Sequence, residues 1–317
     1  MPSPALSIVT SMYQSASSLR EFCERAAAAA AGLTEAYEIV LVNDGSPDDS
    51  LAIALDLHRR DPRIKVLDLS RNFGHHKALM TGLARATGEL VFLIDCDLEE
   101  DPAWLGTFHQ RLRAGDGDVV YGVQTTRKGG WFERASGQLF FAAFNHMLTH
   151  PIPPNIVTAR LMTRRYVDAL VRHDEREVAL APLWQITGFE QHASPVVKQS
   201  RPGSTYSFRR RVSVFVSAIT AFSNRPLIYI FQIGIAVMLL SIAAGAVLLY
   251  QWLRGGIGVP GWASIMVSIW FLGGLMIFCI GVIGIYLAKV FTETKRRPYT
   301  IVRAEHGFTA GPPSPPP

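Results

Sequence analysis

This chain has few cysteines and lacks two common nucleotide-binding motifs. Its 317 residues include three cysteines, Cys23, Cys96 and Cys279, whose wide spacing matches neither a zinc site nor a disulfide framework. Reduced cytoplasmic thiols are therefore expected. No G-x-G-x-x-G follows the first apolar run and no G-x-x-x-x-G-K-[ST] occurs, which disfavours a dinucleotide fold and a P-loop. Residues 1–6 have neither a basic segment nor an apolar core, so we expect no signal peptide.

Charge is absent from two long runs. Residues 227–253 and 255–288 contain no Asp, Glu, Lys or Arg, and each run exceeds the ~20 apolar residues that span a bilayer. Two buried core helices are the alternative, but globular helices seldom stay uncharged over such a length. The runs therefore predict two membrane-spanning helices.

Basic residues flank this hairpin, whereas the connection at residues 254–261 carries one positive charge. The flanking residues are Arg209, Arg210, Arg211 and Arg225 before it, and Lys289, Lys295, Arg296 and Arg297 after it. The positive-inside rule places both long ends in the cytoplasm, which predicts a multi-pass protein of the inner (plasma) membrane. The net charge of +5 gathers near this boundary. It suits an anionic membrane surface, and no aromatic-interleaved basic stripe indicates nucleic acid.

Short apolar runs alternate with amphipathic stretches over residues 6–123. The expected strands are residues 6–9, 37–42, 64–69, 89–95 and 118–123. A capping box at Ser18 and Glu21 starts the first helix, which ends at Gly32. Ser46 and Pro47 are expected as N-cap and first residue of the second helix. The buried stripe of the first helix should be Leu19, Phe22, Cys23, Ala26 and Ala30. This alternation predicts an α/β fold, with a mostly parallel sheet and helices on both faces.

Two carboxylates end the most apolar of these strands. Residues 90–94 are all hydrophobic, and Asp95 and Asp97 follow with Cys96 between them. Residues i and i+2 of a strand share a face, so the two carboxylates should project together. They would repel each other unless a divalent cation carrying a diphosphate lies between them. The alternative is a polar strand end that caps the next helix.

Other polar residues follow the remaining strands, at the sheet edge where α/β proteins bind ligands. Ser11 and Tyr13 follow the first strand, Asp44 follows the second, and Arg71 and Asn72 follow the third. Ser11 and Tyr13 offer a hydroxyl and an aromatic ring that could bind a base. The alternative is that they belong to a loop without a binding function.

Together these residues resemble the family 2, GT-A type glycosyltransferases, and in particular the polyprenyl-phosphate glycosyltransferases. The matching motifs are residues 42–48, 70–78 and 95–99, and two apolar spans follow residues 223–227 as in bacterial members. The resemblance covers about residues 5–290. It implies a GT-A nucleotide-diphospho-sugar transferase domain.

The resemblance also implies roles for individual residues. Asp44 would bind the nucleobase, Asp95 the ribose or the metal, and Asp97 an Mg²⁺ or Mn²⁺ ion that bridges the diphosphate. The donor would be a nucleotide-diphosphate sugar, with a UDP-sugar favoured. Further contacts to the donor are expected from Ser11, Tyr13, Arg71, Asn72 and Lys77. The roles of His75 and His76 stay open, since a solvent-exposed helix start explains them equally well.

The acceptor side departs from the family pattern. Where relatives read Gly-Asp-Phe-Arg-Leu, this chain keeps Arg160 but carries Thr158 in place of the acid. A phosphate monoester with a second pKa of about 6 needs no base, so undecaprenyl phosphate remains the expected acceptor. Arg160, Arg201 and Ser204 are the candidates for binding the lipid phosphate, with Arg160 counted as catalytic beside Asp95 and Asp97. Each arginine could instead be a plain surface residue.

The chain should divide into four parts. These are a cytoplasmic GT-A domain (1–204), an interfacial amphipathic helix (205–225), a transmembrane hairpin (226–290) and a basic, then proline-rich tail (291–317). The interfacial helix rests on apolar residues at helical spacing within 206–222, which a core helix would also show. The interfacial helix would lie on the membrane surface and contact membrane lipids.

The sequence thus predicts an inverting glycosyltransferase that moves a sugar from a nucleotide donor to undecaprenyl phosphate. Inversion follows from the resemblance alone. Two other activities stay open: a membrane glycosyltransferase with another acceptor, and a non-catalytic scaffold with this fold. A processive polysaccharide synthase is disfavoured, because no Gln-x-x-Arg-Trp occurs and two spans are few for a channel. The resemblance also allows a homo-oligomer, since related enzymes associate through their spans.

Overall fold

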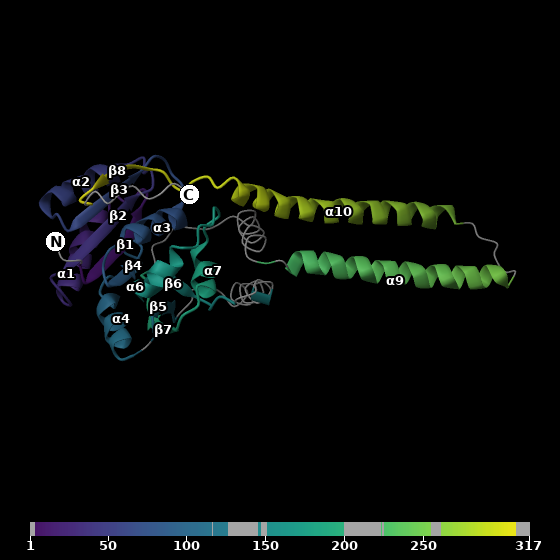
Figure 1. Cartoon of the computed structure of the whole chain (residues 1–317), viewed down its shortest axis with the longest axis horizontal. Helices are drawn as coiled ribbons and strands as arrows, with labels where there is room; N and C mark the ends of the chain where they lie inside the picture. The colour runs from purple at the N-terminus through teal and green to yellow at the C-terminus, as the bar shows by residue number, and fades with distance from the viewer. Residues whose placement is uncertain are drawn as a thin grey trace. The chain divides into compact units, whose positions relative to one another are not determined.

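The computed structural model describes residues 4–115, 117–125, 145–146, 151–199, 223, 225–254 and 261–308. The chain forms two compact units. The sheet unit comprises residues 1–141, 150–205 and 296–317, and the helical unit comprises residues 142–149 and 206–295 (Figure 1).

The described part of the sheet unit contains one eight-stranded sheet in the order β7-β5-β6-β4-β1-β2-β3-β8. The strands are β1 (Leu6–Met12), β2 (Tyr37–Asn43), β3 (Ile64–Leu69), β4 (Leu90–Leu93), β5 (Val119–Gln124), β6 (Ile156–Thr163), β7 (Gln191–Val196) and β8 (Val302–His306). β4, β1, β2 and β3 run parallel to one another, and β5 runs parallel to β7. β6 and β8 pair with their neighbours in the antiparallel sense. The sheet is therefore mixed, with a parallel centre.

Helices cover both faces of this sheet. On one face α1 (Leu19–Ala31) packs against α2 (Ser50–Arg60) and α4 (Trp104–Arg113). On the other, α3 (His75–Arg85) packs on β1 and β2 and against α6 (Arg164–Leu170). A further short helix, α7 (Leu180–Ile186), precedes β7. This is the predicted α/β class with helices on both faces.

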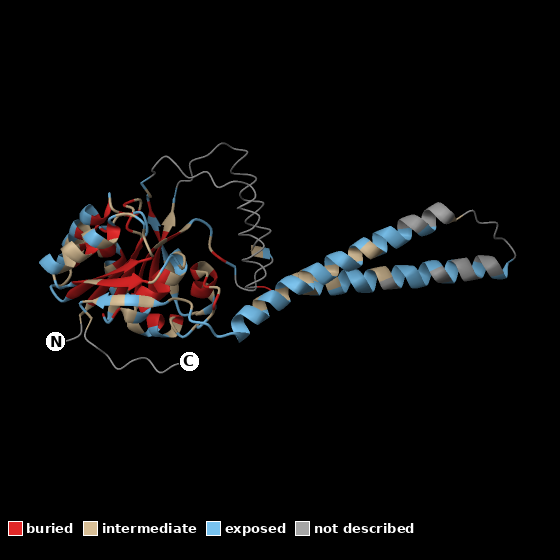
Figure 2. Ribbon diagram, turned by 90° about the horizontal axis from the view of Figure 1, so that it is seen from above, coloured by how far each residue is buried: buried red, intermediate tan, exposed pale blue. Residues whose placement is uncertain are grey.

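The core follows from the alternation of side chains along the strands. Ile8 and Phe92 belong to the large apolar cluster that includes Phe22 of α1 and Phe108 of α4. The rings of Phe92 and Phe108 meet edge to face, with centroids 6.1 Å apart. Figure 2 shows the resulting buried sheet between partly exposed helices.

Several predicted boundaries shift in the structure. The buried residues of α1 are the predicted stripe, but Ser18 makes no capping bond, and its Oγ donates to the Ser15 carbonyl at 3.3 Å. The predicted start of the second helix is wrong. Asp49 is the N-cap and α2 begins at Ser50, because the Asp48 carboxylate accepts bonds from Ser46 Oγ and Ser50 Oγ, both at 2.6 Å, and holds the intervening residues in a loop.

The helical unit contains α9 (Arg225–Leu253) and α10 (Trp262–Thr294). By length and composition, two stretches of these helices could cross a membrane, Arg225–Ala244 and Ser268–Thr294. Their described apolar side chains are largely exposed, including Leu240 and Trp270 (Figure 2). The predicted interfacial helix lies outside the described residues, except for Ser223 and Arg225.

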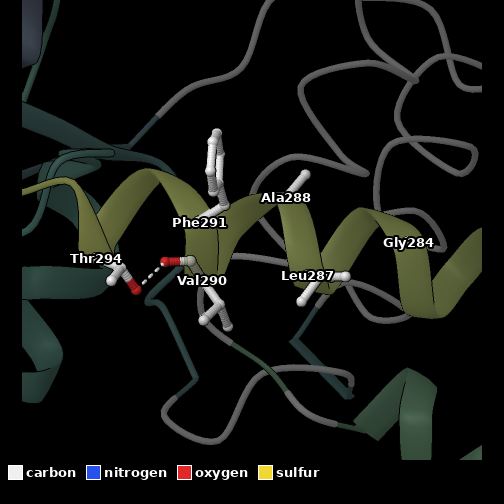
Figure 3. Close-up of a pocket in the computed structure, with 6 residues that line it drawn as sticks. All are labelled: Gly284, Leu287, Ala288, Val290, Phe291 and Thr294. Atoms are coloured by element: carbon white, nitrogen blue, oxygen red, sulfur yellow. Dashed lines mark hydrogen bonds between the residues drawn. The ribbon is translucent and has the colours of Figure 1, made fainter.

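One shallow hollow of about 540 Å³ lies along the end of α10. Its lining comes from α10 alone: Gly284, Leu287, Ala288, Val290, Phe291 and Thr294 (Figure 3). Thr294 Oγ1 donates to the Val290 carbonyl at 2.7 Å, so the polar atom is satisfied within the helix. The surface that remains is apolar, as expected of a helix that faces lipid.

After α10 the chain returns to the sheet, which corrects the predicted tail. β8 pairs antiparallel with β3, and the Ser70 N–H donates to the Ile301 carbonyl at 2.9 Å. The hydroxyls of Thr81 and Thr300 lie 2.8 Å apart, and Arg85 pairs with Glu305. Residues 296–308 therefore belong with the sheet unit rather than with a separate tail.

Candidate active site

Polar side chains from several strands and one helix meet at the carboxyl edge of the sheet. β1 lies between β2 and β4. The chain runs from β1 outward through β2 to β3 and then crosses back through α3 to β4, on the other side of β1. Ligands of open α/β sheets bind at such a switch point. Ser11 ends β1, Asp44 follows β2, and Asp95 follows β4, which ends at Leu93. The two predicted carboxylates thus lie in the loop after the strand rather than on the strand itself.

Asp95 is the centre of a hydrogen-bonded network. Its Oδ1 lies 3.2 Å from His75 Nε2, and its Oδ2 accepts a bond from Thr158 Oγ1 at 2.9 Å. The other ring nitrogen of His75, Nδ1, lies 2.8 Å from Ser11 Oγ. Burial raises the pKa of Asp95, but the bonds from His75 and Thr158 outweigh it, so its pKa lies below the ordinary value. Asp95 is therefore held as an oriented carboxylate.

Asp97 has a different environment. Its Oδ1 accepts the Glu99 N–H at 2.9 Å. Burial, followed by the neighbouring charges of Asp95 and Glu99, raises the pKa of Asp97. Closely spaced carboxylates resist carrying charge together. A cation at this position would relieve that repulsion.

A divalent metal fits these carboxylates. No group of three or more His, Cys, Asp or Glu in the described part of the chain could hold an ion alone. Mg²⁺ needs fewer, because it takes one or two carboxylates and completes its shell with phosphate oxygens and water. Asp95 Oδ1 is buried, and its contact is the ion pair with His75 Nε2 at 3.2 Å. It is suited to be a ligand.

Asp44 shapes the loop beside the site. Its Oδ1 accepts the Phe73 N–H at 2.7 Å and its Oδ2 the Gly74 N–H at 3.0 Å. Burial raises the pKa of Asp44 against these bonds. The next residue, Gly45, has φ +61° and touches the backbone of Arg71. Asp44 therefore fixes the loop in front of α3, and its contact with a nucleobase stays a prediction.

The remaining predicted donor-binding residues line the approach to this edge. Tyr13 is 47% exposed, and Arg71 and Asn72 are exposed as well. The Arg71 guanidinium lies 4.0 Å from the centroid of the Phe73 ring. Lys77 is half-buried in the first turn of α3. The structure gathers these side chains on the loops around Asp44, and their contacts with a donor stay predictions.

Arg160 is not where a lipid phosphate can reach it. The side chain is 1% exposed, and its guanidinium carbon lies 2.9 Å from the centroid of the Trp184 ring. It donates to the Thr158 and Val157 carbonyls at 3.3 and 3.4 Å, and burial lowers its pKa to about 9. Its position on β6, paired with Leu93 on the neighbouring β4, turns it into the interior. Arg201 and Ser204 lie outside the described residues.

Sequence reasoning missed a group beside Asp95. Glu100 is 1% exposed and accepts the Thr158 and Ala159 N–H groups at 3.0 and 2.8 Å. Lys198 Nζ lies 3.2 Å from Glu99 and 3.6 Å from Glu100. Burial, with the charge of Asp95, raises the pKa of Glu100 to about 7. The acidic run after Asp97 was a signal for Glu100, whereas nothing local pointed to Lys198.

The chain is similar to known proteins. The family model for Glycosyl transferase family 2 matches residues 7–171. The chain belongs to glycosyl transferase family 2. A relative from Mycobacterium tuberculosis, described as "Putative glycosyltransferases", is 50% identical over 302 residues, which are 95% of this chain and 88% of the relative.

Other relatives are named as bactoprenol glucosyl transferases. A prophage-derived bactoprenol glucosyl transferase from Shigella flexneri is 32% identical over 272 residues, 85% of this chain and 88% of its own. This likeness confirms the resemblance to polyprenyl-phosphate members. Among solved structures, a mannosyltransferase from Pyrobaculum calidifontis in complex with GDP-Man and Mn²⁺ matches with TM-score 0.47 and 16% identity, covering 93% of this chain and 87% of its own. The family match and the curated relatives identify the chain as a glycosyltransferase.

Proposed function

We propose that this family 2 enzyme transfers a sugar, with inversion, from a UDP-sugar to undecaprenyl phosphate at the cytoplasmic face of the inner membrane. One observation carries the proposal. A single chain holds the Asp95 and Asp97 carboxylates at the ligand-binding edge of its sheet and inserts two membrane-length helices between β7 and β8 of that sheet. The bactoprenol glucosyl transferases among its relatives name a polyprenyl acceptor and glucose.

The return of β8 supports the hairpin topology. β7 precedes α9 and β8 follows α10, and both strands belong to one sheet. The chain must therefore leave and re-enter the same side of the membrane, which requires an even number of crossings. Two spans satisfy this condition. The basic residues at both ends of the hairpin place that side in the cytoplasm.

Asp95 and Asp97 would hold the Mg²⁺ or Mn²⁺ ion of the donor. When bound, the ion acts as a Lewis acid that stabilises the departing nucleoside diphosphate. The protein's own contribution is orientation. Thr158 and His75 hold the Asp95 carboxylate from two sides, and Ser11 holds His75. Partners of this kind fix the direction of a metal-binding carboxylate.

The acceptor chemistry needs no protein base at residue 158. Thr158 Oγ1 already donates to Asp95, so it does not accept a proton there. A phosphate monoester with a second pKa of about 6 is mostly dianionic at neutral pH. Its oxygen forms the new bond to the anomeric carbon while the bond to the nucleoside diphosphate breaks, which inverts that carbon. The site must position and neutralise the two anions.

The test is transfer of radiolabel from nucleotide sugars into the organic-extractable lipid fraction. The full chain in detergent is supplied with undecaprenyl phosphate and Mn²⁺ or Mg²⁺, and Asp97→Asn is compared with the exposed control Asp168→Asn. Label that enters the lipid only with metal and with Asp97 intact supports the proposal. Label in soluble acceptors alone overturns the lipid acceptor. Silence with every donor, despite nucleotide binding, leaves a non-catalytic scaffold.

A further inference from the structure

A separate small pocket opens beside Asp95. It has a volume of about 280 Å³, just under the roughly 300–1,000 Å³ of typical ligand pockets, so it suits a single ring. Several elements line it, with Thr158 on β6, Ala181 and Trp184 on α7, His76 on α3, Glu100 after β4 and Lys198 after β7. Thr158 connects it to the candidate active site, since its Oγ1 bonds Asp95 and its N–H bonds Glu100.

Trp184 lines this pocket and carries a donor without a described partner. The side chain is 5% exposed, and its indole Nε1–H is buried without an acceptor among the described residues. The indole is held in place, because the guanidinium of Arg160 stacks on its ring at 2.9 Å. Its backbone is tied as well, since the Tyr166 hydroxyl donates to the Trp184 carbonyl at 3.2 Å. Buried donors in proteins almost always have a partner, so this one indicates a ligand.

The charged groups of the pocket favour a neutral ligand. Each oxygen of Glu100 accepts one backbone bond, and a carboxylate has lone pairs for about four. Lys198 Nζ lies 3.2 Å from Glu99 and 3.6 Å from Glu100, so these carboxylates offset its charge. Burial, followed by the charge of His75, lowers the pKa of His76. Donors and acceptors side by side, with little net charge, match hydroxyl groups better than a phosphate.

We propose that this pocket receives the sugar ring of the donor and that Trp184 Nε1 and Glu100 select the sugar by hydrogen bonds to its hydroxyl groups. The inference rests on the proposed transferase function and identifies the residues that choose its sugar. The buried Arg160 thereby acquires a role, because its guanidinium stacks on the indole and positions it. A site built around a substrate hydroxyl strongly rejects the analogue that lacks it.

The test compares binding of a nucleotide sugar with binding of its free nucleoside diphosphate. The donor is whichever of UDP-glucose, UDP-galactose, UDP-N-acetylglucosamine and GDP-mannose binds the full chain most tightly with Mn²⁺. Trp184→Phe keeps the ring and removes the N–H. We expect it to weaken nucleotide-sugar binding roughly tenfold, the effect of one hydrogen bond, and to leave the diphosphate unchanged. Trp104→Phe on α4 is the matched control and should change neither.

Deoxy analogues of the same donor sharpen the test. Wild-type protein should lose affinity for the analogue that lacks the hydroxyl bound by Trp184, and Trp184→Phe should no longer distinguish it from the parent donor. Ala181→Leu, a second variant that fills the pocket from α7, should block the sugar and spare the diphosphate. If Trp184→Phe fails to fold, the Ala181→Leu variant tests whether the sugar binds in this pocket.

Three results would overturn the assignment. Either equal losses for the nucleotide sugar and the diphosphate, or no loss in both variants, would show that the sugar lies elsewhere. A change confined to the KM for undecaprenyl phosphate would give the pocket to the acceptor. The binding comparisons need no acceptor turnover, so failure of lipid labelling would refute the proposed function and leave those comparisons intact.

Discussion

Gly45 offers a sharp test of how the loops of the candidate site fit together. It follows Asp44, has φ +61°, and a Cβ built on it would lie 2.5 Å from both the Arg71 carbonyl carbon and the Asn72 nitrogen. Both neighbours are backbone atoms, so no side chain can turn away to make room. Gly45→Ala must therefore push the β2 loop away from the loop that Asp44 holds in front of α3.

The expected cost has two parts. A non-glycine residue in the left-handed region costs about 1–2 kcal/mol, and overpacking adds about 1–3 kcal/mol. Gly188 separates these contributions, because it has φ +73° with open space around its would-be Cβ. Gly188→Ala should therefore lower the stability only by the cost of the left-handed backbone conformation. Gly45→Ala should lose both, for a total of roughly 2–5 kcal/mol.

Thermal melting of the two purified variants in the same detergent measures this difference. One kcal/mol corresponds to roughly 2–4 °C for a domain of this size, so Gly45→Ala should melt clearly below Gly188→Ala. The same variant should raise the KM for the nucleotide sugar, since it displaces the loop that carries Arg71. Equal melting temperatures would show that the two loops do not touch as the structure has them, and would refute the reasoning.

Three further predictions concern the Glu38–Lys65 ion pair, the β3 edge of the sheet and the binding of the metal. Lys65 Nζ lies 2.5 Å from the carboxylate of the buried Glu38. Burial raises the pKa of Glu38, but the bonds from Lys65 and Ser7 outweigh burial and bring this pKa below 4.5. The ionised Glu38 carboxylate therefore stabilises the folded state above pH 4.5, and this stabilisation is lost as the pH falls through the pKa that Glu38 has in the folded state. Glu38→Gln should thus cost about 2 kcal/mol at pH 7, less than a fully buried pair, and match wild type in acid melts. A gap that persists in acid would contradict this. Removal of residues 302–317 uncovers the β3 edge and should cause aggregation in size-exclusion chromatography; an unchanged monodisperse peak would contradict it. His75→Ala should raise the Mn²⁺ concentration for half-maximal transfer roughly tenfold, and an unchanged Mn²⁺ titration would rule out a role in holding Asp95.

Local patterns carried much of the prediction. The alternation of apolar runs with amphipathic stretches predicted the parallel centre of the sheet, because strand and helix periodicity are properties of neighbouring residues. The buried stripe of α1 was predicted residue by residue for the same reason. Two uncharged runs predicted α9 and α10. The helix start at Ser46 failed because a carboxylate two residues on, Asp48, competes for the same hydroxyl and backbone groups.

The sequence by itself determined the α/β class, the two membrane-length helices and the family, since each depends on periodicity, composition or an ordered set of motifs. Only the tertiary structure decided what lies against what. β8 joins β3 from more than 200 residues away, Arg160 turns inward because of its register beside β4, and His75 reaches Asp95 across two loops. The pocket at Trp184 arises in the same way, because its walls come from segments that no local pattern connects.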